Sequence, residues 1–412
     1  MKTSAPTGFD PKSDDFVRDP VAAFARAREQ APVFYYEPLD MWVITRFADL
    51  DHYLADFEAL SHKTLASTPV PEDFRDRIPQ GFFADSWIAL DPPEHTQPRK
   101  VAQRGFTRPK MLALEPRIGQ IANGLIDSFE REGECDLMDR YCYPLTIRTL
   151  CLLFGLDESW EPFMRRLAKT HIKVLNTVID PMDEPERSEV WGAYADSWDE
   201  LREVVDNRIT GPGEDIISEM ATARGPDGEP LMRRDRVVFH CCEIAFAGSD
   251  TTANLMANAL VFLSADPEQM ELVQSDPSLW PAVVDETLRR RPSVAAVPRM
   301  ATRELEIAGT TIPEGARVWM ALAGAGGDDE HYEEPERFDI TRARPDDHLS
   351  FGKGRHFCMG APLARAQGRI GLQTLMERLP SLRILPGQEL EFINNVGAPS
   401  RHTLRAEWTI PG

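Results

Sequence analysis

The chain has 412 residues, of which 42% are hydrophobic and 8% aromatic, and this content is typical of a globular protein whose core can enclose a cofactor. Lys and Arg number 46 against 67 Asp and Glu. The resulting formal charge of −21 argues against nucleic acid or an anionic membrane as a partner.

Residues 1–21 are polar and contain proline, with no apolar run long enough for a signal peptide or a membrane anchor. We therefore expect a soluble, cytoplasmic protein. No stretch rich in Ser, Gly and Pro divides the sequence, so we expect a single domain over residues 1–412. The six cysteines show neither the paired spacing of a disulfide framework nor zinc-type Cys-x-x-Cys pairs, and we expect five of them to be buried thiols.

Helical patterns of apolar residues dominate the chain. The first is a short amphipathic helix over residues 21–30, and residues 33–46 then alternate apolar and polar side chains as a hairpin would. Residues 63–93 have no clear period and read as a long loop with at most a short helix, and loops of this length inside a compact domain are usually functional. Further helices are expected over residues 111–132, 145–154, 160–178, 190–209, 231–265 and 281–291, with an acidic turn at residues 180–186.

Short strands are expected after these helices, at residues 297–302, 305–307 and 318–322. They lead into a coil rich in Asp, Glu and Pro over residues 328–344. Helices followed by small sheets predict an α+β fold that is mainly α.

One cysteine stands in a glycine-rich run ahead of a helical stretch. The run reads Phe351-Gly352-Lys353-Gly354-Arg355-His356-Phe357-Cys358-Met359-Gly360. Its glycines let the backbone curl close to a flat macrocycle, and N–H groups directed at the sulfur can hold it as a thiolate. A thiolate ligand pushes electron density onto haem iron and favours O–O cleavage. The run therefore suggests that Cys358 is an axial ligand to haem iron.

This run resembles the signature of the cytochrome P450 family, with Phe351, Gly354, Cys358 and Gly360 at the family's spacing and His356 at a position that is often basic. The resemblance extends, in motif order, from about residue 10 to residue 408. It implies the P450 fold, a helical triangular prism with small β-sheets. Haem b would lie between the long oxygen-binding helix and the cysteine-ligand helix, in contact with Phe351, Gly352, His356, Cys358 and Gly360.

The expected long helix contains a polar interruption, Ala247-Gly248-Ser249-Asp250-Thr251-Thr252. A glycine and hydroxyl residues at such a point can widen or bulge a helix where it passes a ligand. The segment resembles the family's oxygen-binding motif, which implies that Asp250 and Thr251 deliver protons and that Ala247 and Gly248 open a groove for dioxygen beside the haem. The alternative is that Asp250 and Thr251 make ordinary helix contacts.

Two further motifs resemble family segments. Glu286 and Arg289 stand three residues apart on one predicted helix, and with Arg337 they are similar to a buried Glu–Arg–Arg network that supports the cysteine loop. The sequence departs from the family at Gly326-Gly327-Asp328, where many members carry Asn-Arg-Asp.

Four basic residues match positions that bind the haem propionates in this family. They are His95, Arg99, Arg299 and His356. His95 and Arg99 lie one helical turn apart, so both can grip one anionic partner. A solvated charged face is the alternative for each residue taken alone.

The substrate pocket is the least determined part of the site. Counting back along the long helix from Thr251, Glu243, Ile244 and Ala247 can line a cavity above the iron. Glu243 would bind a cationic or hydroxylated substrate, or would instead turn aside into a salt bridge or a water network. The apolar lining of this pocket is expected to consist of Phe82, Phe83, Trp87, Ile88, Phe246, Val294 and Ala295. Packing in the protein core explains each of these residues, taken singly, equally well.

The resemblance implies a monooxygenase that uses O2 to hydroxylate or O-/N-dealkylate a small organic molecule. The sequence has no Gly-x-Gly-x-x-Gly fingerprint and no iron–sulfur segment, so the electrons are expected from a ferredoxin or flavodoxin with its reductase. Basic residues would dock this partner: Lys100, Arg104, Lys353, Arg355 and Arg365. We expect a monomer. The alternatives are a peroxide-driven peroxygenase of the same fold and a non-catalytic haem sensor or carrier.

Overall fold

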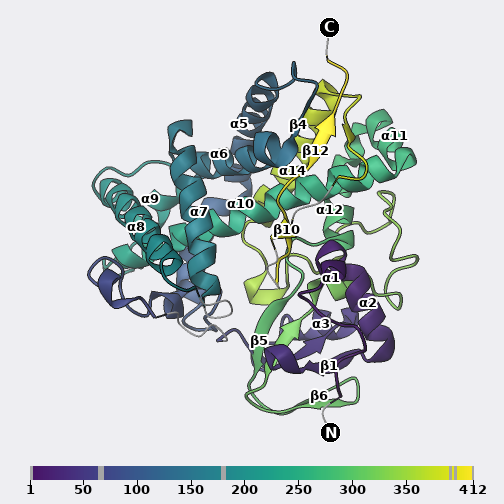
Figure 1. The fold of residues 1–412 in the computed structure, drawn as a ribbon. Coiled ribbons are helices and arrows are strands. Elements are labelled where there is room, and N and C mark those ends of the chain that lie inside the picture. Colours follow the sequence, from purple (N-terminus) through teal and green to yellow (C-terminus); the bar gives the residue numbers. More distant parts are fainter. Residues whose placement is uncertain (1–2, 64–68, 178–181, 389–391, 394–396, 411–412) are drawn as a thin grey trace. The chain divides into compact units, whose positions relative to one another are not determined.

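The computed structural model describes residues 3–63, 69–177, 182–388, 392–393 and 397–410 (Figure 1). The chain divides into two compact units. The first comprises Met1–Thr64, Glu115–Leu145 and Thr251–Gly412, and the second comprises Leu65–Leu114 and Thr146–Asp250. We describe each unit by itself.

The second unit is helical. Its own helices are α4 (Thr96–Gln103), α7 (Glu161–Asn176), α8 (Glu186–Thr210) and α9 (Ile216–Thr222). Helix α8 packs against both α7 and α9. Three helices contribute residues to both units: α5 (Arg108–Asp127), α6 (Tyr143–Leu153) and α10 (Arg234–Ala265).

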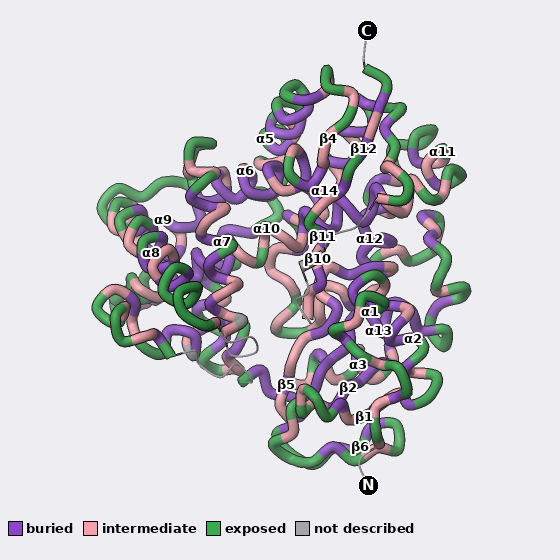
Figure 2. The backbone as a smooth tube through the Cα atoms, in the orientation of Figure 1, coloured by how far each residue is buried: buried purple, intermediate pink, exposed green. Residues whose placement is uncertain are grey.

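The first unit contains a five-stranded sheet of order β1-β2-β8-β5-β3. Its strands are β1 (Val33–Tyr36), β2 (Met41–Ile44), β3 (Leu60–Ser61), β5 (Val297–Ala301) and β8 (Arg317–Met320). Strands β1 and β2 form the predicted hairpin, with Val33 opposite Ile44, and β8 pairs parallel to β2. The adjacent strands β2 and β8 are buried along most of their length (Figure 2). This sheet therefore carries much of the apolar core of the first unit.

Smaller sheets and helices complete the first unit. The small strands are β4 (Glu134–Asp136), β6 (Leu305–Ile307), β7 (Thr310–Ile312), β9 (Arg383–Ile384), β10 (Phe392–Ile393), β11 (Ser400–Arg401) and β12 (Arg405–Glu407). The helices are α1 (Asp14–Arg18), α2 (Pro20–Gln30), α3 (Phe47–Tyr53), α11 (Pro267–Ser275), α12 (Trp280–Arg290), α13 (Leu322–Gly326) and α14 (Ala361–Arg378).

Short non-α turns connect these elements. They are the 3₁₀ helices η1 (Glu37–Leu39), η2 (Glu72–Phe74), η3 (Phe82–Asp85), η4 (Arg104–Phe106), η6 (Glu158–Trp160), η7 (Pro277–Leu279) and η8 (Gly354–His356), and the π-helical turn η5 (Met138–Cys142). The expected long loop at residues 63–93 contains only η2 and η3 as helical turns in its described part.

The mainly α, α+β class and the expected long helices are confirmed. Helix α2 begins where the sequence favours it, because the Asp19 carboxylate accepts a hydrogen bond from the Ala22 N–H at 3.0 Å and Pro20 occupies the first position. Helix α5 ends at Asp127, five residues before the expected end at 132. Residue 178 of the expected helix and residues 180–181 of the expected acidic turn lie outside the described residues.

A buried ion pair fixes the coil before the cysteine run. The Arg289 guanidinium makes two 2.7 Å hydrogen bonds to the Glu286 carboxylate, and both side chains are inaccessible to solvent. Arg289 also donates to three backbone carbonyls, those of Gly326, Pro335 and Arg337. These bonds connect α12 to the end of α13 at Gly326 and to the coil at Pro335 and Arg337.

The structure corrects the third member of this network. The Arg337 side chain is 54% exposed and its guanidinium lies 3.4 Å from Glu334, so Arg337 contributes its carbonyl and not its charge. Arg342 supplies the second guanidinium, with Nε donating to Glu286 Oε1 at 3.1 Å. Both arginines lie in irregular coil, where no periodicity indicates which one turns inward.

We predict that Arg342→Ala lowers the free energy of unfolding by about 1.5–3 kcal/mol, because it removes a charge-assisted hydrogen bond from a buried carboxylate. Arg337→Ala is the matched control, since it keeps the backbone carbonyl, and we expect a change within about 0.5 kcal/mol. Urea unfolding followed by circular dichroism measures both. Equal destabilisation by the two substitutions would contradict the assignment.

Candidate functional site

The cysteine run forms a tight loop in the first unit. The Cys358 N–H donates to the Phe351 carbonyl at 2.8 Å, and Gly352 and Gly354 have φ angles of +67° and +69°. Left-handed backbone of this kind favours glycine. At Gly354 a Cβ atom would also lie 2.9 Å from Ala55 Cα. The loop then leads into the 18-residue helix α14 three residues after Cys358, and the start of a helix favours negative charge.

The other cysteines are poor candidates for a thiolate. Cys142, Cys151, Cys241 and Cys242 are buried, and Cys135 is half-buried. Burial raises the pKa of Cys135 and of Cys151 to about 12, and raises the pKa of the other three above its ordinary value. These five thiols therefore stay protonated at neutral pH.

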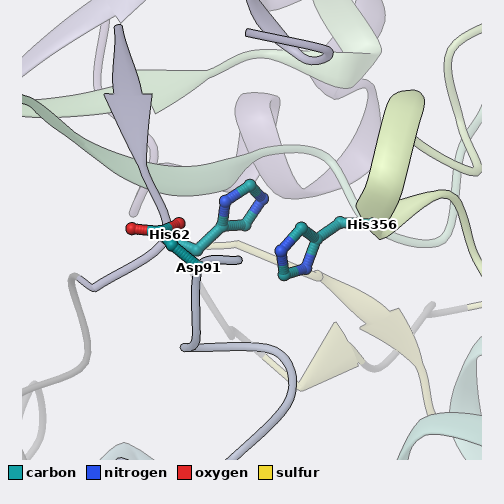
Figure 3. A group of neighbouring side chains, drawn as sticks. All are labelled: His62, Asp91 and His356. Atoms are coloured by element: carbon teal, nitrogen blue, oxygen red, sulfur yellow. The ribbon is translucent and has the colours of Figure 1, made fainter. Parts of the chain in front are cut away.

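The first unit contains several basic side chains that are buried or half-buried. Arg299 in β5 is 8% exposed, so a cation is held almost out of water. The rings of His62 and His356 stack with centroids 3.4 Å apart and an interplanar angle of 11° (Figure 3). Asp91, also labelled there, belongs to the second unit. Sequence reasoning found Arg299 and His356 but missed His62, whose only signal was its place directly after a short strand.

The second unit contributes His95, Arg99 and the polar stretch of α10. His95 is buried at the start of α4, and the Arg99 N–H donates to its carbonyl at 3.3 Å, which confirms that the two residues lie one turn apart. On α10, Ala247 is exposed and Gly248 half-buried, between long buried runs. A Cβ at Gly248 would lie 2.9 Å from the Leu150 side chain of α6. Helix α10 is thus accessible at a point where its side chains are small.

Asp250 and Thr251 occupy successive positions of α10, and both are half-buried. The expected widening of this helix is not seen, since α-helix continues from Arg234 to Ala265. In the first unit, Ser293 Oγ donates to the Thr251 carbonyl at 2.7 Å. This bond ties the Thr251 turn to the segment that precedes β5.

The expected pocket residues fall into different environments. Phe82 and Phe83 lie in η3 and are buried with ring centroids 4.0 Å apart, whereas Ile88 is 47% exposed. Ile244 is buried on α10, and Phe246 is half-buried beside Ala247. In the first unit, Val294 packs against the core of the five-stranded sheet, and Ala295 is fully buried with its N–H bonded to the Gly397 carbonyl at 2.9 Å.

Glu243 is buried and both of its carboxylate oxygens are engaged. Oε1 accepts a hydrogen bond from Ser86 Oγ, and Oε2 lies 2.7 Å from His240 Nδ1. The His240 ring stacks on Trp87 with centroids 3.9 Å apart. Glu243 was expected either to bind the substrate or to form a salt bridge or water network within the protein. The structure shows a contact within the protein, and the carboxylate connects the loop residues Ser86 and Trp87 to α10.

Sequence reasoning also missed a second polar pair in this unit. His171 of α7 and Tyr194 of α8 are fully buried, with His171 Nδ1 3.0 Å from the Tyr194 hydroxyl. Burial lowers the pKa of His171 to about 3 and raises the pKa of Tyr194 well above its usual value. A single histidine on the apolar face of an amphipathic helix gave no signal that distinguished it from a core residue.

A family model described as Cytochrome P450 matches residues 187–406. The chain belongs to the cytochrome P450 family. The 6-deoxyerythronolide B hydroxylase of Saccharopolyspora erythraea is 32% identical over 388 residues, which cover 91% of this chain and 92% of that protein. The vitamin D(3) 25-hydroxylase of Pseudonocardia autotrophica is 30% identical over 398 residues, with coverage of 94% and 93%.

Solved structures agree with this assignment. CalO2 superposes with a TM-score of 0.85 at 27% identity, over 99% of this chain and 100% of CalO2. The protein therefore has the P450 fold and is a cytochrome P450 monooxygenase. Among the described residues, no helix is long and apolar enough to cross a membrane.

The residues of each unit fit the haem-thiolate group that the family implies. The first unit offers a cysteine just before α14, the buried Arg299 and the half-buried His356, and these two basic side chains suit the carboxylates of a haem. The second unit offers the buried His95 and the accessible small residues of α10. Both sets have the chemistry that an anionic, flat iron macrocycle requires.

Acid should destabilise this P450 through His171. The unfolded chain binds a proton at this imidazole near its ordinary pKa of 6.5, whereas the folded protein resists protonation down to about 3. The contribution to stability is therefore complete above pH 6.5 and is lost as the pH falls toward 3. We expect wild type to lose up to about 1.4 kcal/mol per pH unit more than His171→Gln between pH 6.5 and 4.5.

Urea unfolding of wild type and His171→Gln across this pH range measures the difference. Parallel curves for the two proteins would show that His171 does not remain neutral in the folded state. His402, which is exposed in the first unit, provides the control substitution His402→Gln, and we expect no change in slope from it.

Proposed function

We propose that the Cys358 thiolate is the axial ligand of haem b iron, and that the protein hydroxylates a small organic molecule with O2 and two electrons from a ferredoxin or flavodoxin. The observation that carries this proposal is the position of Cys358. The turns at Gly352 and Gly354 place this cysteine three residues before α14, whereas burial keeps the other five thiols protonated.

Basic residues would hold the haem carboxylates. In the first unit these are Arg299 and His356, and the stacked ring of His62 supports His356 in its orientation. In the second unit His95 and Arg99 serve the same purpose from one turn of α4. A guanidinium held almost out of water is favourable when it has an anionic partner, which a haem carboxylate supplies.

The bound haem supplies the site at which O2 is reduced and activated. Around it, Asp250 and Thr251 would move protons: the carboxylate takes them from solvent and the Thr251 hydroxyl holds them near the reacting oxygen. The hydrogen bond from Ser293 to the Thr251 carbonyl keeps this turn of α10 in place. The small side chains of Ala247 and Gly248 leave room for dioxygen.

Electron delivery would use a separate partner, because the sequence has no flavin or nicotinamide fingerprint. Arg355 is exposed, with its guanidinium 5.2 Å from the Phe57 ring centre. Two other basic residues already have acidic partners in the chain: Lys353 pairs with Asp51 and Arg365 with Asp285. Arg355 therefore suits an acidic partner protein better. The relatives named as hydroxylases favour hydroxylation over dealkylation. We further propose a cytoplasmic monomer with one haem domain.

Cys358→Ala should abolish the strongly red-shifted absorption band that the reduced protein gives with carbon monoxide, because that band requires a thiolate ligand. Cys135→Ala is the matched control, since this cysteine is also half-buried, and it should keep the band. Circular dichroism checks that both variants remain folded. A red-shifted band that persists in Cys358→Ala would rule out this ligand.

Thr251→Ala should uncouple electron flow from hydroxylation. With a surrogate ferredoxin and reductase, we expect NADH consumption to continue and hydrogen peroxide to accumulate, while product per electron falls about 10-fold or more. The substrate for this assay is one found by its shift of the haem spectrum on binding. Thr252→Ala, at the buried neighbouring position, is the control. Unchanged coupling in Thr251→Ala, with turnover supported by peroxide alone, would instead indicate a peroxygenase.

A further inference from the structure

The second unit contains an aromatic cluster built around one buried imidazole. The rings of Phe83, Tyr194, Phe239 and Phe246 have centroids 5.6–6.3 Å from that of His171. They come from η3, α8 and α10, so three elements converge on α7 at this point. His171 is fully buried among them, although an apolar side chain would suit such surroundings better.

Within the described part of the chain, only one ring nitrogen of His171 has a hydrogen-bond partner. Nδ1 lies 3.0 Å from the Tyr194 hydroxyl, whereas Nε2 is inaccessible to solvent and has no hydrogen-bond partner among the described residues. Leaving a buried polar atom unpaired costs stability, and each such atom in a folded protein requires an explanation. A bound molecule that hydrogen bonds to Nε2 provides one.

The cluster adjoins the accessible stretch of α10. Phe246 is half-buried and Ala247, the next residue, is exposed, whereas Cys241 to Ala245 are all buried. A molecule that occupies this stretch of α10 therefore meets the aromatic cluster at Phe246. The Phe246 ring separates this stretch from His171, with ring centroids 5.8 Å apart, so a movement of this one ring would bring the molecule to the imidazole.

The charge of the cluster restricts the chemistry of this molecule. Glu243, the carboxylate three residues before Phe246 on α10, already binds Ser86 and His240. The His171 ring is neutral at neutral pH because burial lowers its pKa to about 3. None of the five side chains of the aromatic cluster is charged at neutral pH, so the molecule that suits them is uncharged and largely apolar.

The hydrogen-bond direction at Nε2 depends on Tyr194, whose hydroxyl also interacts with the Cys242 thiol. If the Tyr194 O–H donates to Nδ1, then Nε2 carries the proton and donates. If Nδ1 donates to Tyr194, then Nε2 accepts. A hydroxyl group on the ligand satisfies either tautomer, and a carbonyl satisfies only the first.

We propose that His171 determines substrate specificity: an uncharged, largely apolar substrate packs against the aromatic cluster and hydrogen bonds through an oxygen atom to His171 Nε2. The inference rests on the proposed function only in taking the bound molecule as the substrate. It names His171 as a binding residue and assigns the imidazole no part in the oxidation.

Three rigid probes that differ in one group test it: fluorene, 9-fluorenol and 9-fluorenone. Calorimetric titration of the haem-loaded protein measures their affinities without relying on turnover. We expect 9-fluorenol to bind about 3- to 10-fold more tightly than fluorene, the gain from one neutral hydrogen bond. Binding of 9-fluorenone equal to that of 9-fluorenol identifies Nε2 as a donor, and weaker binding identifies it as an acceptor.

Variants of His171 locate the interaction. His171→Phe should bind 9-fluorenol and fluorene equally. His171→Gln can place an amide nitrogen or oxygen near the position of Nε2 and should retain the preference, whereas His171→Asn reaches only the position of Nδ1 and should lose it. Asn258→Leu is the control and should leave the preference unchanged. It removes another buried polar side chain, on the part of α10 in the first unit, whose Oδ1 no described residue bonds.

Equal affinity of wild type for fluorene and 9-fluorenol, an unchanged preference in His171→Phe, or no saturable binding of any probe would overturn the proposal. The first two results would point to a buried water as the partner of Nε2. The carbon monoxide spectrum of the same samples separates this proposal from the haem-thiolate assignment. If the red-shifted band is missing while 9-fluorenol still binds more tightly than fluorene, the haem-thiolate assignment is refuted and the proposed role of His171 remains.

Discussion

The coil that precedes the cysteine loop depends on one buried guanidinium. Arg289 has five N–H donors, and the structure provides five acceptor contacts: both Glu286 oxygens and the carbonyls of Gly326, Pro335 and Arg337. A lysine offers only three donors from one atom, so it could not bind the carboxylate and three carbonyls together. Burying both charges is costly, but here every donor is satisfied, and residues without regular structure are thereby held in one conformation.

The second unit uses buried polar groups differently. In the first unit all donors of Arg289 are matched, whereas in the second unit two short chains of polar groups each end on an imidazole. One runs from Ser86 through Glu243 to His240, and the other from Cys242 through Tyr194 to His171. Both histidines keep an Nε2 atom that no described residue bonds. A network in which every polar group is bonded makes its part of the protein rigid. A network that ends on an unbonded atom suits a region where a ligand supplies the missing hydrogen bond.

The sequence indicated features that local patterns encode and missed those that depend on distant partners. Long apolar periods predicted α8 and α10, and the glycine spacing identified the loop that carries Cys358. Helix α9 was missed because most of its seven residues are buried, which leaves no amphipathic period. Strand β12 pairs with β4 across some 270 residues, with Ala406 opposite Cys135, and strands of three residues carry too little alternation to predict this. The choice of Arg342 over Arg337 likewise depends on how the coil folds against Glu286.

The departure from the family pattern at Gly326-Gly327-Asp328 follows from the same constraint. A Cβ atom at Gly326 would lie 2.1 Å from the Arg289 carbonyl, so the close approach of the end of α13 to α12 excludes any side chain there. The positive charge that other members carry in this step comes instead from Arg28 of α2, which donates to the Gly324 and Gly327 carbonyls and lies 3.5 Å from Asp328. Asp328 in turn accepts the Phe47 N–H at 2.6 Å. The donors for the Gly324 and Gly327 carbonyls are therefore supplied by a guanidinium from a distant helix and not by a side chain of the segment itself.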